Sequence, residues 1–324
     1  MKRLREARAF TLLATAAAIW GSTFIATKLV VKDIGPFTLA ALRFLLASLV
    51  LLPFAWRQGY RFSISLRPRF LVLGLVGIAP HYALQNVALL WTAAASAALI
   101  VGGIPAATAL LSRWLLREPL TVRQGFGIAL SIVGVGLITG GALEASPLAL
   151  LGDLLVVGSV FAWALYTVEG KTLSERHTAS TITVAGMVSA LFVLVPAAIV
   201  EVAVGGAPTF SAGGIVGLVY LALAASALTF YLWNLGLRDV DASVAGTFIN
   251  LVPVLGFVFA VASGESIAPL QVAGGAIALL GVWLATVQRG SAESTPRGEI
   301  DDRTTVSGKP GLRPVRQPAA RRPR

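Results

Sequence analysis

The chain carries one long sequence pattern twice, at an offset of 143 to 148 residues. The segment AIWGSTFIATK (18–28) returns as FAWALYTVEGK (161–171), and YALQNVALLWTAAASAA (82–98) returns as FYLWNLGLRDVDASVAG (230–246). The pairs that continue the repeat are Pro105 and Pro253, Glu118 and Glu265, Gln124 and Gln271, Gly127 and Gly274, and Gly134 and Gly281. A repeat of this length indicates an architecture of two similar halves.

The composition places both halves in a membrane. Hydrophobic residues make up 56% of the chain and charged residues 13%, and the mean hydropathy is +0.81. Long apolar runs at this density are typical of membrane spans, each of which needs about 20 residues. We therefore predict an all-α integral membrane protein with ten transmembrane helices. The predicted spans are residues 10–30, 36–55, 70–90, 93–114, 123–140, 152–172, 180–199, 213–235, 242–262 and 269–288.

Ten spans divide into two sets of five, so the second half enters the bilayer in the opposite orientation to the first. Inverted-topology repeats are typical of alternating-access transporters. The predicted organisation is a cytoplasmic N-terminal segment (1–9), a first five-helix repeat (10–140), an external linker (141–151), a second five-helix repeat (152–288) and a disordered basic cytoplasmic tail (289–324).

The distribution of Lys and Arg predicts the orientation. These residues concentrate in the N-terminal segment and in the loops 56–69, 113–123 and 171–179, whereas the intervening connections are poor in them. By the positive-inside rule, the chain lies in the cell inner (cytoplasmic) membrane with both termini in the cytoplasm. The basic tail either reinforces this orientation or contacts anionic membrane lipid.

Several function classes lack support in the sequence. The chain has no Cys and two His, which leaves no thiolate metal site and no His-Glu cluster. It lacks both a phosphate-binding Gly-rich motif with Lys and a Gly-x-Ser-x-Gly motif. The net charge of +11 follows the loops and tails, so nucleic acid is not the expected partner. We expect no enzyme, no catalytic residue, no cofactor and no metal.

Polar and aromatic residues at membrane depth are the candidate solute-binding residues, because they are costly there unless they face a cavity or a partner helix. His81 lies near the middle of the third span and shares a helix face with Gln85. It contacts a solute or a proton, or bonds a neighbouring helix. Trp20 and Trp163 are repeat mates near mid-depth, and they either wall a cavity or pack helices.

Other candidates have equally simple structural alternatives. Arg43 either snorkels to the surface or pairs with an anionic solute, and snorkelling is the expectation for Lys28. Asn86 either binds solute or caps a helix end. Asn250 lies deeper, and with Tyr166 it completes the candidate binding residues.

Proline and glycine carry further expectations. Pro105 and Pro253 bend spans that either gate the cavity or are static. The glycines of segments 125–141 and 274–285 permit close helix contact, which predicts packing roles for spans 5 and 10. Carboxylates inside the predicted spans are almost absent apart from Glu169.

The motifs resemble the EamA-type branch of the drug/metabolite transporter superfamily over about residues 10–288. They are WGSTFIATK, FTLAALRFLLASLVLLP, AAASAALIVGGIPAATALLSRWLLREPLTVRQGFGIALSIVGVGLI and GDLLVVGSVFAWALYTV. The resemblance implies two inverted five-helix repeats, a central cavity lined mostly by spans 1, 3, 4, 6, 8 and 9, and transport of small metabolites. It places family site positions on Trp20, Arg43, His81, Asn86 and Trp163. Arg43 has no basic counterpart in the second half, where Gly186 lies near the matching position.

We therefore expect a secondary transporter that exports small metabolites such as amino acids, amines or related amphipathic solutes. Proton coupling through His81 is one alternative, and an uncoupled facilitator or an importer is another. A membrane-embedded enzyme and an accessory membrane protein explain the sequence less well. The expected partners are the solute and membrane lipid, and the sequence leaves a homodimer open.

Overall fold

Proline and glycine mark several helix boundaries. The computed structural model describes residues 2–115, 121–174, 176–236, 248 and 250–286. Proline is favoured as the first residue of a helix, where its missing N–H has no intrahelical partner, and it begins four helices here, at Pro36, Pro68, Pro147 and Pro269. Gly35, between the first two helices, has φ 89°, a conformation that glycine adopts without strain. The Thr178 and Ser211 side chains cap the helices that follow them.

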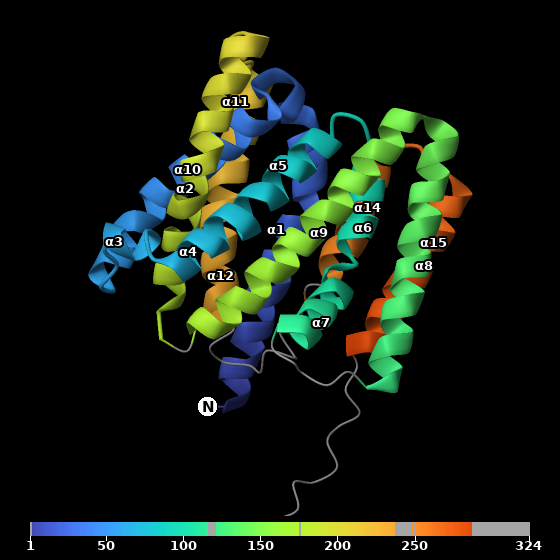
Figure 1. Cartoon of the computed structure of the whole chain (residues 1–324), viewed down its shortest axis with the longest axis horizontal. Helices are drawn as coiled ribbons and strands as arrows, with labels where there is room; N and C mark the ends of the chain where they lie inside the picture. Colours follow the sequence, from blue (N-terminus) through green and yellow to red (C-terminus); the bar gives the residue numbers. More distant parts are fainter. Residues whose placement is uncertain (1, 116–120, 175, 237–247, 249, 287–324) are drawn as a thin grey trace, which may run out of the picture. The chain divides into compact units, whose positions relative to one another are not determined.

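The elements follow one another along the chain with short connections (Figure 1). They are α1 (Lys2–Ile34), α2 (Pro36–Arg57), α3 (Phe62–Ser65), α4 (Pro68–Val72), η1 (Leu73–Ile78), α5 (Ala79–Ala88), α6 (Ala94–Val101), α7 (Ile104–Leu115), α8 (Val122–Ala145), α9 (Pro147–Ser174), α10 (Ala179–Gly205), α11 (Ala212–Val219), η2 (Tyr220–Leu228), α12 (Thr229–Gly236), α14 (Leu251–Ala262) and α15 (Pro269–Thr286).

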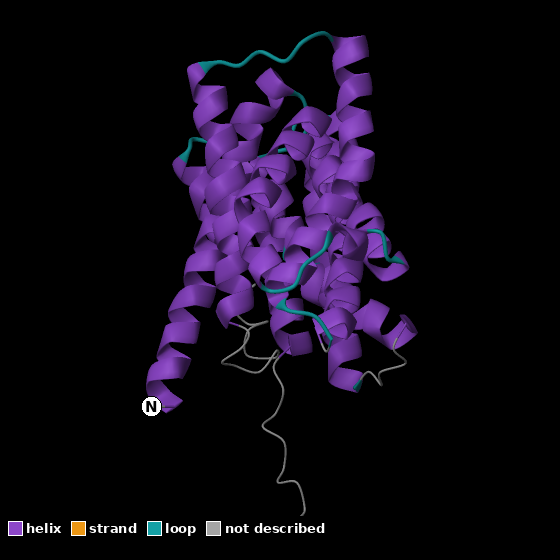
Figure 2. Cartoon of the chain, turned by 90° about the vertical axis from the view of Figure 1, so that its left-hand side faces the viewer, coloured by secondary structure: helices purple, strands orange, loops and turns teal. Residues whose placement is uncertain are grey.

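Seven helical stretches of the described chain are long and apolar enough to cross a membrane. Three further apolar helices are shorter, at Val122–Ile138, Leu251–Ala262 and Pro269–Leu284. The residues that the structure describes contain helices and loops and no strand (Figure 2). The chain is therefore an all-helical, multi-pass membrane protein.

Two π-helical segments occupy corresponding positions of the sequence repeat. The segment η1 begins at Leu73 and η2 begins at Tyr220, which is the same offset that relates the two halves elsewhere. A π-helical turn shifts the backbone hydrogen-bond ladder and is frequent at functional sites. Both segments continue into the helices, α5 and α12, that carry aromatic residues toward the centre of the bundle.

The helix contacts follow the sequence repeat as well. In the repeat, α1 corresponds to α9, α2 to α10, α5 to α12, and α6–α7 to α14. The helix α1 packs on α14 and α12, and its counterpart α9 packs on α6, α7 and α5. The counterparts α2 and α10 pack on each other, as do α8 and α15. The packing pattern is thus nearly unchanged when the two halves are exchanged.

Glycine brings α8 and α15 into backbone contact. A Cβ built at Gly134 would lie 2.3 Å from the Ala278 nitrogen, and one built at Gly281 would lie 2.4 Å from the Ser131 nitrogen. The predicted packing role of the glycine-rich segments is confirmed. Figure 1 shows the two helices side by side at one side of the bundle.

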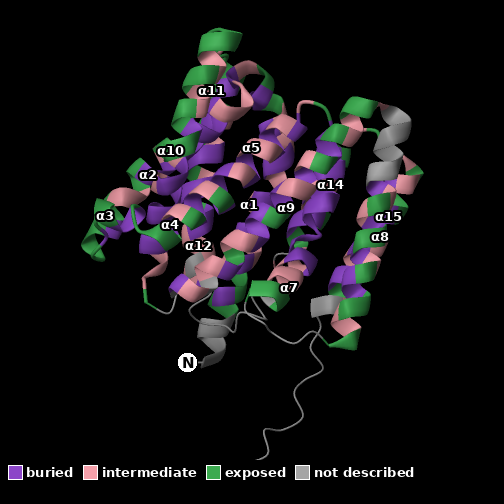
Figure 3. Cartoon of the chain, in the orientation of Figure 1, coloured by how far each residue is buried: buried purple, intermediate pink, exposed green. Residues whose placement is uncertain are grey.

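Figure 3 shows buried residues within the helix bundle and exposed residues on its outside. The exposed set includes many large apolar side chains, and the buried set includes polar and charged ones. Large aliphatic residues such as Leu49, Val200 and Val216 are more than half exposed. Arg43, His81 and Asp153 are buried. This is the reverse of a water-soluble surface, and lipid is the solvent that suits such an exterior.

Candidate functional site

Aromatic rings from three elements meet in the interior. The Trp20 ring of α1 lies 6.1 Å from the Trp163 ring of α9, 5.6 Å from Phe230 and 5.3 Å from Trp233, both on α12. The Trp163 ring stacks on Tyr166 at 4.8 Å. The repeat mates Trp20 and Trp163 are thus in mutual contact, edge to face at 80°.

A cavity lies against this cluster. Helices α1, α5, α9 and α14 and the α6–α7 region line it with Trp20, Thr23, Phe24, His81, Tyr82, Gln85, Val101, Ile104, Trp163, Val252 and Pro253. Its volume is about 50 Å³, which is room for about four water molecules.

His81 is positioned from two sides. Its Nδ1 lies 2.8 Å from the Ser159 carbonyl oxygen, and the ring lies 4.8 Å from both Trp163 and Tyr82. A carbonyl only accepts, so Nδ1 carries a proton and donates it. The second nitrogen, Nε2, is the one left for a solute or a transferable proton.

Arg43 lies behind the cavity wall and does not line it. Its Nε donates to the Ser226 hydroxyl at 2.6 Å, and its Nη2 lies 3.4 Å from the Ala225 carbonyl oxygen, which also accepts from Trp20 at 3.2 Å. The guanidinium carbon lies 4.5 Å from the Tyr82 ring centroid. Within the described chain the one ion pair joins other residues. The Arg43 charge is therefore met by a hydroxyl, a π-helical carbonyl and a ring.

The remaining predicted residues divide between the cavity and its surroundings. Gln85 and Pro253 line the cavity. Pro105 follows the lining residue Ile104, and Tyr166 stacks behind Trp163.

The two asparagines lie outside the cavity lining. Asn86 is turned away, because its amide donates to the Pro36 carbonyl oxygen at 2.9 Å and so ties α5 to the start of α2. Asn250 directly precedes α14 and is half-buried.

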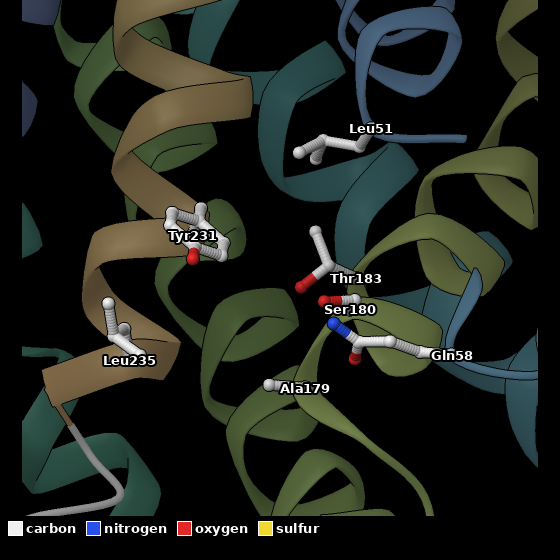
Figure 4. Close-up of a pocket in the computed structure, with 7 residues that line it drawn as sticks. All are labelled: Leu51, Gln58, Ala179, Ser180, Thr183, Tyr231 and Leu235. Atoms are coloured by element: carbon white, nitrogen blue, oxygen red, sulfur yellow. The ribbon is translucent and has the colours of Figure 1, made fainter. Parts of the chain in front are cut away.

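A second pocket lies between α2, α10 and α12, where α2 ends and α10 begins. Figure 4 shows Leu51, Gln58, Ala179, Ser180, Thr183, Tyr231 and Leu235 around it. Its volume equals that of the central cavity, about 50 Å³. It contains neither an imidazole nor an indole, so the central cavity is the stronger candidate site. Helix α12 connects the two regions, because its Tyr231 lines the second pocket and its Trp233 contacts Trp20, which lines the central cavity.

Two acidic residues were missed or misjudged from sequence. Asp153 of α9 is fully buried, and its Oδ1 accepts from the Thr92 hydroxyl. The predicted span 152–172 therefore contains a second carboxylate besides Glu169. Lys28 was expected to snorkel, but its Nζ pairs with Glu265 at 2.5 Å. The prediction for Lys28 was wrong because a carboxylate 237 residues further along the chain lies within reach.

Known proteins are similar to this chain over most of its length. A family model described as "EamA-like transporter family" matches residues 7–140 and 150–287. An "Uncharacterized transporter" of Archaeoglobus fulgidus is 31% identical over 86% of this chain and 97% of its own length. A "Probable amino-acid metabolite efflux pump" of Salmonella typhimurium is 26% identical over 82% of this chain and 90% of its own.

One further relative and one solved structure are also similar to this chain. A "Probable terminal-alkyne amino-acid exporter" of Streptantibioticus cattleyicolor is 27% identical over 90% of this chain and 99% of its own length. A protein of known crystal structure is similar with a TM-score of 0.60 and 23% identity, over 86% of this chain and 96% of the other, and this likeness concerns the fold alone.

Proposed function

Because the chain belongs to the EamA-like transporter family, we propose that this membrane transporter exports amino acids or closely related carboxylate-bearing metabolites across the cytoplasmic membrane by alternating access. The observation that carries the proposal is the central cavity, where repeat-related indole rings, an imidazole and an amide converge in front of a buried guanidinium. The names of the Salmonella and Streptantibioticus relatives support the same class of solute.

The aromatic walls suit the apolar part and the ammonium group of an amino acid. Trp20, Trp163 and Tyr82 present ring faces and edges to the cavity. Such rings bind apolar side chains by burial and cations by their negative faces. Gln85 offers both a donor and an acceptor for the polar groups.

The charge around the cavity favours a carboxylate over a simple amine. None of the described lining residues is acidic, and the Arg43 guanidinium lies behind the lining residue Tyr82. A buried cation without an acidic partner raises the potential of the adjacent space and attracts an anionic group. A protonated amine would be repelled by this positive potential, because it has no carboxylate to offset its own charge.

The exchange symmetry of the packing supports inverted repeats. Two halves with the same internal contacts and opposite orientation can exchange conformations, which exposes a central cavity to one side and then to the other. In this proposal both termini are cytoplasmic, and the second pocket, beside Gln58, is a vestibule on the cytoplasmic side.

For energy coupling we propose His81. Imidazole is the side chain that titrates closest to neutral pH, and His81 lies in the cavity with Nε2 left for a transferable proton. Proton exchange at this ring would link solute release to proton entry.

Transport in proteoliposomes tests the proposal. We expect uptake of radiolabelled amino acids to exceed uptake of the corresponding decarboxylated amines, and Arg43→Gln to reduce that preference while Arg43→Lys keeps part of it. Trp163→Ala should raise KM. The matched control is Phe161→Ala, an aromatic residue of the same helix that is 44% exposed and lies outside the lining.

Three outcomes would contradict parts of the proposal. Equal or preferred transport of the amines would refute carboxylate recognition. An unchanged KM in Trp163→Ala would move the binding site elsewhere. A pH profile between about 5 and 8 that His81→Gln leaves intact would exclude His81 as the coupling group and favour an uncoupled facilitator.

A further inference from the structure

Three helices that line the cavity converge beyond it, at the end where α6 begins. A Cβ built at Gly256 of α14 would lie 2.7 Å from the Ala98 Cβ of α6 and 3.1 Å from the Phe24 ring of α1. A Cβ built at Gly21 of α1 would lie 2.8 Å from the Leu255 Cβ. These glycines let α1, α6 and α14 close tightly over this side of the cavity.

Glu265 fastens the three helices together at their ends. Its Oε1 accepts from Lys28 Nζ at 2.5 Å and from the Ala94 nitrogen at 3.1 Å, and its Oε2 accepts from the Ala95 nitrogen at 3.0 Å. Ala94 and Ala95 begin α6, and the N-terminal N–H groups of a helix favour a negative charge. One carboxylate thus holds α6, α1 and the connection between α14 and α15.

The turn that leads into α6 is held from the opposite side as well. Asp153 of α9 accepts from the Thr92 hydroxyl, and Thr92 lies two residues before α6. A Cβ built at the neighbouring Gly152 would lie 3.0 Å from the Ala88 carbonyl oxygen. Two carboxylates therefore fix the α5–α6 turn. Asp153 of α9 holds it on one side, and Glu265 of the connection between α14 and α15 holds it on the other.

We propose that Glu265, Lys28 and the start of α6 form the gate on this side of the cavity, and that the gate is closed in the present conformation. The inference rests on the proposed transport function. Lys28 lies four residues, or about 6 Å, beyond the lining residue Phe24 on α1, and Ala94 lies about 10 Å beyond Val101 on α6.

Opening this gate requires α1, α6 and α14 to separate from one another. Separation breaks the Lys28 pair and exposes the first N–H groups of α6 to water. Burial alone would raise the pKa of Glu265, but the hydrogen bonds from Lys28, Ala95 and Ala94 and the Lys28 charge together lower it. The gate is therefore closed with Glu265 ionised.

Thiol accessibility tests the gate without any knowledge of the solute. The chain contains no cysteine, so Thr23→Cys places a single thiol in the cavity lining. A membrane-impermeant maleimide is added from the face where a separate Ser266→Cys variant reacts. We expect slow labelling of Thr23→Cys alone and labelling faster by about tenfold when Glu265→Gln is added, because a charged hydrogen-bond partner is lost.

Controls separate the gate from general loosening. Lys28→Met should also accelerate labelling, and it substitutes for Glu265→Gln if that variant fails to insert. Lys32→Met, an exposed lysine one turn further along α1, should leave labelling unchanged. The exchange Lys28→Glu with Glu265→Lys restores opposite charges but puts a cation at the start of α6, so it should not restore slow labelling.

Wild-type labelling rates in both Glu265→Gln and Lys28→Met would overturn the proposal, as would equal acceleration by Lys32→Met. So would a Thr23→Cys thiol that already reacts as fast as Ser266→Cys. Faster labelling in the two gate variants, together with transport of amines instead of amino acids, would retain the gate and refute only the proposed solute class.

Discussion

Gly134→Ala is the sharpest test of how α8 and α15 are joined. The added Cβ would lie 2.3 Å from the Ala278 nitrogen and 2.6 Å from the Gly274 oxygen, whereas ordinary contacts begin near 3.4 Å. The two helices must then separate locally by 3.4 − 2.3, or about 1.1 Å, because backbone atoms cannot rotate away. Overpacking of this kind costs about 1–3 kcal/mol.

Gly136→Ala is the matched control, since it lies on the same helix and a Cβ built there meets no atom within 4 Å. The assay is the apparent melting temperature of purified protein in detergent, followed by Trp fluorescence. We expect Gly134→Ala to lower it and Gly136→Ala to leave it unchanged or raise it, because alanine is favoured over glycine by about 1 kcal/mol in a helix interior.

A double mutant makes the test stricter. Gly281→Ala disturbs the same contact from α15, because a Cβ built at Gly281 would lie 2.4 Å from the Ser131 nitrogen of α8. The double variant should therefore lower the melting temperature by less than the sum of the two single variants. Transport per folded molecule should keep its KM, since neither residue lines the cavity. Equal melting temperatures for Gly134→Ala and Gly136→Ala would refute the close backbone contact.

Three further predictions concern orientation, pH and the tail. A single Cys at Gly206 should react with an impermeant reagent outside the cell and one at Ser63 should not; the reverse pattern would contradict the positive-inside assignment. Because the Glu265 pKa is lowered from 4.5, its stabilisation of the closed gate is complete above that value and is lost only as pH falls through the lowered pKa. The labelling rate of Thr23→Cys, divided by that of the exposed Ser266→Cys thiol at the same pH to cancel thiolate formation, should therefore be flat between about pH 5 and 8. Truncation after Gln288 should leave insertion and transport intact, and an inserted but inactive protein would show that the tail is needed.

The sequence determined the membrane character, the repeat and the family. Hydropathy reports what solvent each segment tolerates, so it predicts long apolar helices without knowledge of their neighbours. The repeat paired Trp20 with Trp163 before any contact was known, and their rings do meet. The four-residue spacing of His81 and Gln85 placed both on one helix face, and both line the central cavity.

Tertiary structure alone decided which polar groups reach the cavity. Asn86 and Gln85 are adjacent in sequence, yet one bonds the Pro36 carbonyl and the other lines the cavity, because a helix turns them about 100° apart. Arg43 looked equally able to snorkel or to bind solute, and its position behind Tyr82 follows from how α2 packs on η2.

The pairing of Lys28 with Glu265 also depended on packing. The two residues lie 237 positions apart, and hydropathy describes each span separately without specifying which helix ends meet. The charge of an isolated lysine at a helix end predicts snorkelling. Only the convergence of α1, α6 and α14 brings a carboxylate within reach, and that convergence is set by glycine contacts between helices.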